Sequence, residues 1–275
     1  MLAFLNSLPV QTALALSAAT ALLCGVLGLF TLIRRQAFAG HALADVSSAG
    51  GAGSLLLGIS PLLGFLVFGL AGAGSLEFMQ SRRTSARDEA AGILLGAGMG
   101  ITALLLHFCL THHGASGAVQ TVMFGAMFAV PLTTVFWAWG ITILCLLILA
   151  VIARPLLVVS LEPDLARVAG LPVRILSFLF MLLLALGVTL AAMTVGAILA
   201  TALLVGPPAV ALRLGRSTLE AMIISVVCGL LSCWAGIVLA YASYNWLPGH
   251  TWPVSFFIVS LLLLSYLLAQ ARTWG

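Results

Sequence analysis

Lysine is absent from this chain, and charged residues of any kind are scarce. Only 7% of the 275 residues are charged, whereas about 25% are charged in a typical soluble domain. A phosphate-binding loop of the type GxxxxGK[ST] needs a lysine, so ATP hydrolysis by such a loop is excluded. The GxSxG and HExxH motifs of common hydrolases are also missing, and the five cysteines form no CxxC pair. The net charge of +4 falls in short loops, so we expect no nucleic-acid partner.

Long apolar runs occupy most of the chain, and 63% of its residues are hydrophobic. Most of these runs can cross a hydrocarbon core of about 30 Å at about 1.5 Å per helical residue. The predicted spans are Val10 to Ile33, Gly50 to Gly72, Ala90 to Leu110, Leu132 to Ala153, Ile175 to Thr194, Val195 to Leu212, Leu219 to Tyr244 and Pro253 to Gln270. They predict an all-α, polytopic protein of about eight transmembrane helices, with residues 1–275 forming a single membrane domain surrounded by lipid.

Two apolar stretches depart from simple membrane spans. The fifth and sixth spans have almost no linker between them, and Gly196 and Thr201 interrupt the run. Such broken helices are expected beside a transport path, where irregular backbone faces protein or water. The stretch from Gly114 to Val130 is too short for a full span, so we expect a half-inserted or interfacial segment.

The arginines predict how the protein is oriented. With eight spans both termini lie on one side, nine arginines fall on that side, and Arg34 and Arg35 fall on the other. Because positive residues favour the cytoplasmic side, we expect a multi-pass protein of the bacterial plasma membrane with both termini in the cytoplasm. The stretch from Arg34 to Gly53 would then lie at the outer surface.

The connector between the fourth and fifth spans, residues 154–174, contains residues that typically start and end a short helix. Glu162 is placed to cap it, Pro163 suits its first turn, Gly170 suits the residue just past its end, and Pro172 prevents its continuation. A helix of about two turns is marginal in water unless it docks on something. It either lies on its own membrane domain or contacts a cytoplasmic partner.

Three glycines at intervals of four residues, Gly92, Gly96 and Gly100, form a doubled GxxxG ridge. Glycines at this spacing allow another helix backbone to approach closely. We expect packing within the chain, with a dimer contact as the alternative.

His41 and Asp45 are the two residues that best fit a metal ion. Four residues apart on a helix, they would lie on one face. Imidazole suits zinc and related transition metals, and carboxylate suits manganese and iron as well. The alternative is a pair that only hydrogen-bonds to itself. A more distant alternative is intramembrane hydrolysis by Ser47 or Ser48 with His41.

Four blocks of the sequence resemble the permease subunits of ATP-binding-cassette importers for zinc, manganese and iron, the ABC-3 permease family. They lie in the family's order along nearly the whole chain. The blocks are AFAGHALADVSSAG (37–50), RDEAAGILLGAG (87–98), SLEPDLARVAGLPVR (160–174) and VGAILATALLVGPPAVALRL (195–214). One departure is clear, because His41 stands where the family has aspartate and Asp45 where it has histidine. The two ligand types are exchanged and both are retained.

The resemblance implies a transport subunit, not an enzyme. It implies a homodimeric or paired permease with cytoplasmic ATPase subunits and an extracytoplasmic metal-binding protein. The substrate would be a divalent metal ion and not a permanently bound cofactor; imidazole and the outer-loop histidines favour zinc, followed by manganese or iron. The connector would become the helix that couples the permease to the ATPase, through Glu162, Pro163, Asp164, Leu165, Ala166, Arg167, Gly170 and Leu171. A permease for a metal chelate or an organic cofactor is the alternative.

Overall fold

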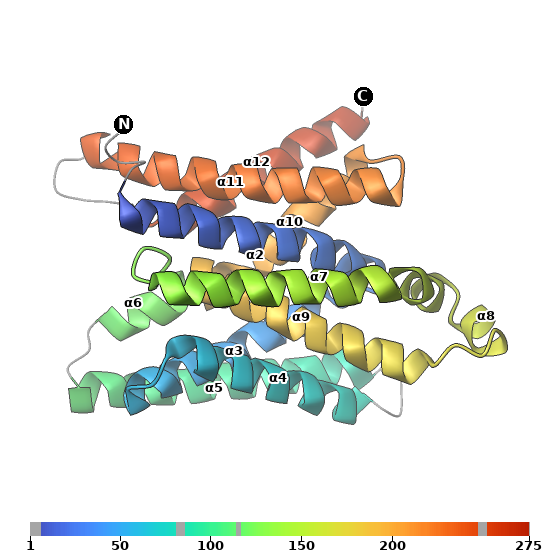
Figure 1. The fold of residues 1–275 in the computed structure, drawn as a ribbon, viewed down its shortest axis with the longest axis horizontal. Coiled ribbons are helices and arrows are strands. Elements are labelled where there is room, and N and C mark those ends of the chain that lie inside the picture. Colours follow the sequence, from blue (N-terminus) through green and yellow to red (C-terminus); the bar gives the residue numbers. More distant parts are fainter. Residues whose placement is uncertain (1–6, 81–85, 114–116, 247–251, 275) are drawn as a thin grey trace.

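The computed structural model of the protein describes residues 7–80, 86–113, 117–246 and 252–274, and every regular element in these ranges is a helix. The helices pack side by side in an elongated bundle (Figure 1). They are α2 (Leu8–Ile33), α3 (Ala37–Leu57), α4 (Pro61–Gln80), α5 (Ala86–His113), α6 (Gly117–Phe124), α7 (Leu132–Leu161), α8 (Pro163–Val168), α9 (Val173–Val195), α10 (Ala197–Leu214), α11 (Thr218–Trp246) and α12 (Val254–Trp274). Eight of them, α2, α4, α5, α7, α9, α10, α11 and α12, are long and apolar enough to span a membrane. The predicted all-α polytopic fold is thereby confirmed.

Helix α3 is long but was not predicted as a helix of its own, and the predicted span from Gly50 to Gly72 is wrong. The helix ends before Gly58, whose φ of 67° is a left-handed conformation open to glycine, and Pro61 begins α4. A Cβ on Gly50 would lie 2.0 Å from the carbonyl oxygen of Gly64 in α4, so the two backbones touch. Helix α3 packs against α4, α5, α9 and α10, and a helix enclosed by protein does not need a lipid-facing apolar surface.

Hydrogen bonds between helices show which helix ends lie together. The guanidinium of Arg34, at the end of α2, donates to the hydroxyls of Ser160 near the end of α7 and Ser177 near the start of α9. Near the other end of α2, the indole of Trp139 in α7 donates to the carbonyl of Ala15. We refer to the two ends of the bundle as the α8 end and the α6 end, after the short helices found there (Figure 1).

The two ends of the chain lie at opposite ends of the bundle. Helix α2 starts with Leu8 at the α6 end. Helix α12 runs parallel to α10, because Ser255 donates to the carbonyl of Val195 at the α6 end and Arg213 donates to the hydroxyl of Tyr266 further along. Its last residues therefore lie toward the α8 end (Figure 1). Because α3 adds one passage through the described bundle, α2 begins and α12 ends at opposite ends, which differs from the eight passages on which the shared side of the termini was predicted.

The same extra passage changes the distribution of positive charge. Arg34 and Arg35 were predicted to face away from the other arginines, but the contacts of Arg34 with α7 and α9 place both at the α8 end. All nine arginines that the structure describes lie at or near this end: Arg34, Arg35, Arg87, Arg154, Arg167, Arg174, Arg213, Arg216 and Arg272. Arg82 and Arg83 lie outside the described residues. Among the described arginines none lies at the α6 end, whereas the eight predicted spans placed nine arginines on one side and two on the other.

The predicted half-inserted segment is a short helix followed by a reversal of the chain. Helix α6 has eight residues, and Gly125 then adopts a φ of 82°. A Cβ on Gly125 would lie 2.1 Å from the carbonyl oxygen of Thr194, and one on Gly196 would lie 2.2 Å from that of Met123. The segment therefore packs closely on the break between α9 and α10, where Gly196 itself has a φ of 101°.

The predicted glycine ridge does not pack α5 within this chain. Cβ atoms on Gly96 and Gly100 would meet nothing within 4 Å in the part of the chain that the structure describes, and one on Gly92 would only approach the ring of Phe38 at 3.8 Å. The close contact is made by Gly98, where a Cβ would lie 2.8 Å from the backbone nitrogen of Val46 in α3. Intrachain packing through Gly96 and Gly100 is therefore wrong, because that face of α5 turns away from α3.

The helix predicted in the connector is confirmed as α8, and the expected residues stand at its start and just past its end. Glu162 is its N-terminal flanking residue, although its side chain makes no capping hydrogen bond, and Pro163 is the first helical residue. Gly170 follows the helix with a left-handed φ of 73°. The result is one and a half to two turns of helix that connect α7 to α9 at the end of the bundle (Figure 1).

Candidate metal site

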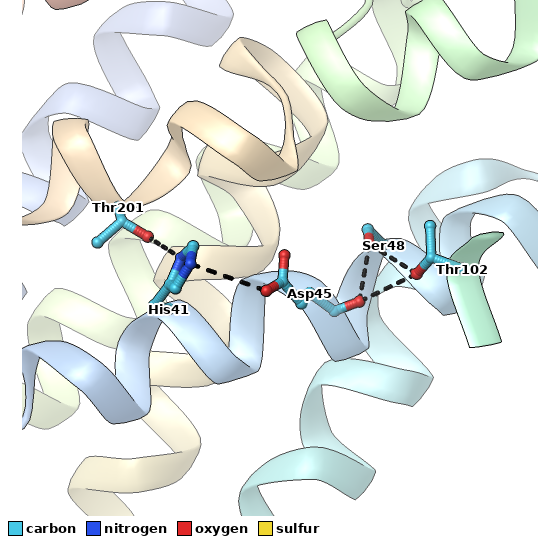
Figure 2. Close-up of polar contacts among 5 residues, drawn as sticks. All are labelled: His41, Asp45, Ser48, Thr102 and Thr201. Atoms are coloured by element: carbon cyan, nitrogen blue, oxygen red, sulfur yellow. Dashed lines mark hydrogen bonds and ion pairs between the residues drawn. The ribbon is translucent and has the colours of Figure 1, made fainter. Parts of the chain in front are cut away.

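His41 and Asp45 lie on the same face of α3, one helical turn apart (Figure 2). The imidazole Nε2 and the carboxylate Oδ2 are 3.9 Å apart. The His41 side chain is 34% exposed, whereas that of Asp45 is only 7% exposed. The two groups are therefore close enough to share one ion, and the histidine is the member that solvent or a partner can reach.

The pair lies at mid-depth in the bundle and not at the outer surface. The carbonyl oxygen of Asp45 accepts hydrogen bonds from Thr102, near the middle of α5, and from Ser48 one turn further along α3 (Figure 2). The expectation of a surface site is wrong because α3 begins at the α8 end and leads into the protein. Substrate sites of many transporters lie near the membrane midplane, so the corrected depth fits a transport site better than the predicted one.

One oxygen of Asp45 is buried without a partner. Oδ2 is inaccessible to solvent and has no hydrogen-bond partner among the described residues. Burying an ionised carboxylate without a compensating group is costly, at about 2.5 to 3.5 kcal/mol for aspartate at the centre of a membrane-inserted helix. This oxygen lies 3.9 Å from Nε2 of His41. A cation bound by both atoms would neutralise the buried carboxylate.

Thr201 fixes the orientation of the His41 ring. Its Oγ1 lies 2.7 Å from Nδ1 of His41, which leaves Nε2 facing Asp45 (Figure 2). When Nδ1 carries the proton and donates it to Thr201, the lone pair of Nε2 is free to bind a metal. Thr201 lies in α10, shortly after the break at Gly196. In the sequence it marked only an interruption of an apolar run, so its role as a partner of His41 was missed.

A groove runs beside the pair, between α3, α10 and α12. Its volume is about 730 Å³, and its wall is apolar except for a few groups that include His41, Thr201 and Tyr266. The full set of lining residues is Ala37, Phe38, His41, Thr201, Ala202, Val205, Gly206, Ala209, Val259, Leu262, Leu263 and Tyr266. His41 is thus open on one side, while Asp45 is enclosed by protein.

The hydroxyls of Ser47 and Ser48 are engaged away from His41. Ser47 shares a hydrogen bond with Thr189 of α9 at 3.1 Å, and Ser48 bonds to Thr102 at 3.0 Å and to the Asp45 carbonyl. The imidazole turns toward Thr201 instead (Figure 2). The structure therefore does not bring a serine and His41 together as a nucleophile and base, which argues against intramembrane hydrolysis.

The chain supplies two ligands at this position. Within the described residues, no group of three histidine, cysteine, aspartate or glutamate side chains is placed to hold a metal ion. A transition metal ion commonly takes four or more ligands. The remaining ligands must come from outside this set, from water, from backbone oxygens or from another chain.

Helix α8 exposes two of its apolar side chains. Leu165 is 60% exposed and Val168 is 87% exposed, whereas Ala166 is fully buried against the bundle. Asp164 and Arg167 form an exposed ion pair at 3.1 Å, which contributes little to stability. Among the α8 side chains that the structure describes, the small Ala166 is the buried one, so the larger apolar groups of Leu165 and Val168 are available to a partner.

These features together define a class of protein. A helical bundle of apolar spans with a histidine–aspartate pair at mid-depth, a broken helix beside it and a small exposed helix at its arginine-rich end has the architecture expected of a transport permease. The chain belongs to the ABC 3 transport family, whose family model matches residues 8–270.

Characterised relatives and solved structures agree with this assignment. The chain is 30% identical to the manganese transport system membrane protein MntC of Halalkalibacterium halodurans, over 82% of this chain and 77% of that protein. It is 24% identical to the chelated iron transport system membrane protein YfeD of Yersinia pestis, over 92% of this chain and 84% of that protein. Its fold superposes on PsaBC from Streptococcus pneumoniae, solved in complex with a Fab, with a TM-score of 0.83 and 26% identity, over 98% of this chain and 95% of that one.

Proposed function

We propose that this protein is the membrane-spanning subunit of an ATP-binding-cassette importer and that it moves a divalent first-row transition metal ion through the site at His41 and Asp45. The observation that carries the proposal is the buried, unpartnered Oδ2 of Asp45 beside an imidazole that Thr201 orients. Family membership over residues 8–270 supplies the transport context. The metal is the substrate, so a site with few ligands suits an ion that must also leave.

Manganese is the first candidate for the substrate, ahead of the zinc that the histidines favoured. The names of the relatives give manganese and chelated iron. The pair itself offers carboxylate oxygens from Asp45 and one imidazole nitrogen from His41, and the described residues near it include no thiolate. Oxygen-rich sites suit manganese, whereas zinc more often takes nitrogen and sulfur ligands. Iron and zinc remain the competitors to be tested against it.

A second copy of the chain would complete the site. His41 opens into an apolar groove, and a two-fold symmetric pair of permeases places the same surface of each copy opposite the other. Two copies meeting at this groove would supply two histidines and two carboxylates to one ion. The incomplete ligand set and the apolar wall thus both support a homodimer, with the ion held between the subunits.

The ATPase would dock at α8, and the extracytoplasmic binding protein at the α6 end. The arginines concentrate at the α8 end, and positive residues favour the cytoplasm, so the chain would start outside and end inside. Leu165 and Val168 would enter a groove on the ATPase, with Glu162, Asp164 and Arg167 around them and Gly170 and Leu171 leading into α9. Closure of the ATPase pair on ATP would then move α8 and shift the bundle between its outward-open and inward-open states.

Uptake measurements test the proposal. The chain should be expressed with its ATPase and binding protein in cells that lack their own metal importers, and uptake of radioactive manganese, zinc and iron compared. We expect ATPase-dependent manganese uptake, reduced by more than about 100-fold in His41→Ala and Asp45→Asn. Losing a group that only hydrogen-bonds to a metal ligand typically costs 10- to 100-fold, and losing a ligand itself should cost more. The control Glu89→Gln removes an exposed carboxylate at the start of α5 and should transport normally.

The same experiment addresses the alternative substrates. A permease for a metal chelate or an organic cofactor does not need protein ligands for the ion, so its uptake would survive removal of His41 and Asp45. Retained uptake in both variants would contradict the metal site.

A further inference from the structure

Arg34 occupies a position where three parts of the bundle meet. Its guanidinium uses three nitrogens: Nε donates to Oε1 of Gln36 at 3.3 Å, Nη1 to the hydroxyl of Ser160 at 3.1 Å, and Nη2 to the hydroxyl of Ser177 at 2.8 Å. The guanidinium also lies over the ring of Phe180, with its carbon 5.2 Å from the ring centroid. One side chain therefore ties the α2–α3 turn to both α7 and α9.

The two serines flank α8. Ser160 lies in the last turn of α7, three residues before Pro163, and Ser177 lies in the second turn of α9. Ser160 also donates to the carbonyl of Leu156, so its hydroxyl is oriented to accept from Arg34. Helix α8 is joined to α7 and α9 and packs on both. A movement of α8 would therefore displace the ends of α7 and α9 that Arg34 holds together.

On its other side Arg34 leads directly into α3. The α2–α3 turn is closed by hydrogen bonds from the Gln36 amide to the Thr31 carbonyl and from the Arg35 amide to the Leu32 carbonyl. Arg35 has a left-handed φ of 55°, so this is a Schellman-type helix end with arginine where glycine is usual. Gln36 is buried and forms the N-terminal flank of α3, and its carbonyl accepts from the Gly40 amide, next to His41. These backbone hydrogen bonds hold the start of α3 against the end of α2.

We propose that Arg34 is the positioning residue that couples α8 to α3, so that ATP-driven movement of α8 reaches the metal pair. The inference rests on the proposed function and adds to it a route between the two sites. Arginine is suited to this task because its planar fork reaches three acceptors on three segments while stacking on an aromatic ring, which the single ammonium of lysine cannot do.

The test is the ratio of metal ions transported to ATP molecules hydrolysed, measured with the full transporter in proteoliposomes. Arg34→Lys keeps the charge and loses the fork, and the double variant Ser160→Ala and Ser177→Ala removes two of the acceptors. We expect both to lower the ratio about tenfold, since hydrogen bonds to charged groups are among the stronger ones, while ATP hydrolysis and manganese binding persist. Arg35→Lys changes the exposed neighbour at the same membrane face and should keep the wild-type ratio.

Each outcome decides the inference. A wild-type ratio in Arg34→Lys, or a parallel fall in uptake and ATP hydrolysis that leaves the ratio unchanged, would overturn it. If Arg34→Lys fails to accumulate, the serine double variant, which removes no charge, decides the question alone. Failure of the proposed function looks different, because the wild-type transporter itself would then move no metal.

Discussion

Helix α3 carries the proposed metal site and helix α8 the proposed contact with the ATPase. The first is enclosed by protein, and the second is largely exposed. Helix α3 is enclosed by α4, α5, α9 and α10, and its proposed metal ligand Asp45 is almost fully buried. Helix α8 touches the bundle through Ala166 and leaves Leu165 and Val168 exposed. The difference indicates that α3 is placed by packing inside the protein, while α8 is completed by a partner. Substitutions in α3 should therefore disturb stability or metal binding, and substitutions in α8 should disturb coupling alone.

The largest effect that separates the two helices is expected from charge on α8. Leu165→Glu and Val168→Glu place a carboxylate where an apolar contact with the ATPase is proposed, and a buried unpaired charge costs several kcal/mol. We expect ATPase binding and coupled uptake to fall by about 100-fold or more, with an unchanged melting temperature for the isolated permease. The control Thr111→Glu adds the same charge at an exposed position near the end of α5. A normal coupled rate in both α8 variants would contradict the docking role.

A smaller effect should follow from a methyl group on the buried side of α3. The Cβ of Gly50→Ala would lie 2.0 Å from the Gly64 carbonyl oxygen, a contact that forces the α3–α4 pair apart. Overpacking of this kind costs about 1–3 kcal/mol, so the melting temperature should fall. The matched control is Gly96→Ala in α5, whose Cβ meets nothing within 4 Å among the described residues. Equal stability of the two variants would show that α3 is not as tightly enclosed as the structure indicates.

The sequence predicted the elements whose signals are local. The bounds of α8 followed from Pro163, Gly170 and Pro172, and the break between α9 and α10 followed from Gly196. These residues act through their own backbone conformations, so their effects can be recognised without knowing what surrounds them. Seven of the eight apolar spans were also predictable from the sequence, because lipid imposes the same requirement along each of them.

Helix α3 could not be recognised in this way. Its sequence is rich in alanine, glycine and serine because its neighbours are other helices. A high hydropathy is typical of helices that contact lipid, so hydropathy does not distinguish α3. The prediction joined its second half to α4 across Gly58 and Pro61. That one error moved His41 and Asp45 to the outer surface, placed Arg34 on the wrong side and put both chain termini on one side. The placement of His41 and Asp45 on one helical face was predictable, but their depth and the partner Thr201 required the fold.

The smallest predicted effect concerns the hydrogen bond between Thr201 and His41. Thr201→Val keeps the shape of the side chain and removes the hydroxyl 2.7 Å from Nδ1, whereas Thr201→Ser retains a hydroxyl. Groups that hydrogen-bond to a metal-bound histidine typically contribute 10- to 100-fold to metal affinity. We expect the affinity for manganese to fall about tenfold in Thr201→Val and to change little in Thr201→Ser, as measured by equilibrium dialysis. Similar affinities in the two variants would mean that packing alone orients the ring.

The central claim is that one metal ion is held by His41 and Asp45 of two copies of this chain. Pulsed electron paramagnetic resonance of manganese bound to the purified permease tests it most directly, because coupling to a nitrogen nucleus reports imidazole ligation. The account predicts one manganese ion per two chains and a histidine nitrogen signal that disappears in His41→Ala. A nitrogen signal that persists unchanged in His41→Ala, or manganese bound with no nitrogen ligand in the native protein, would contradict it.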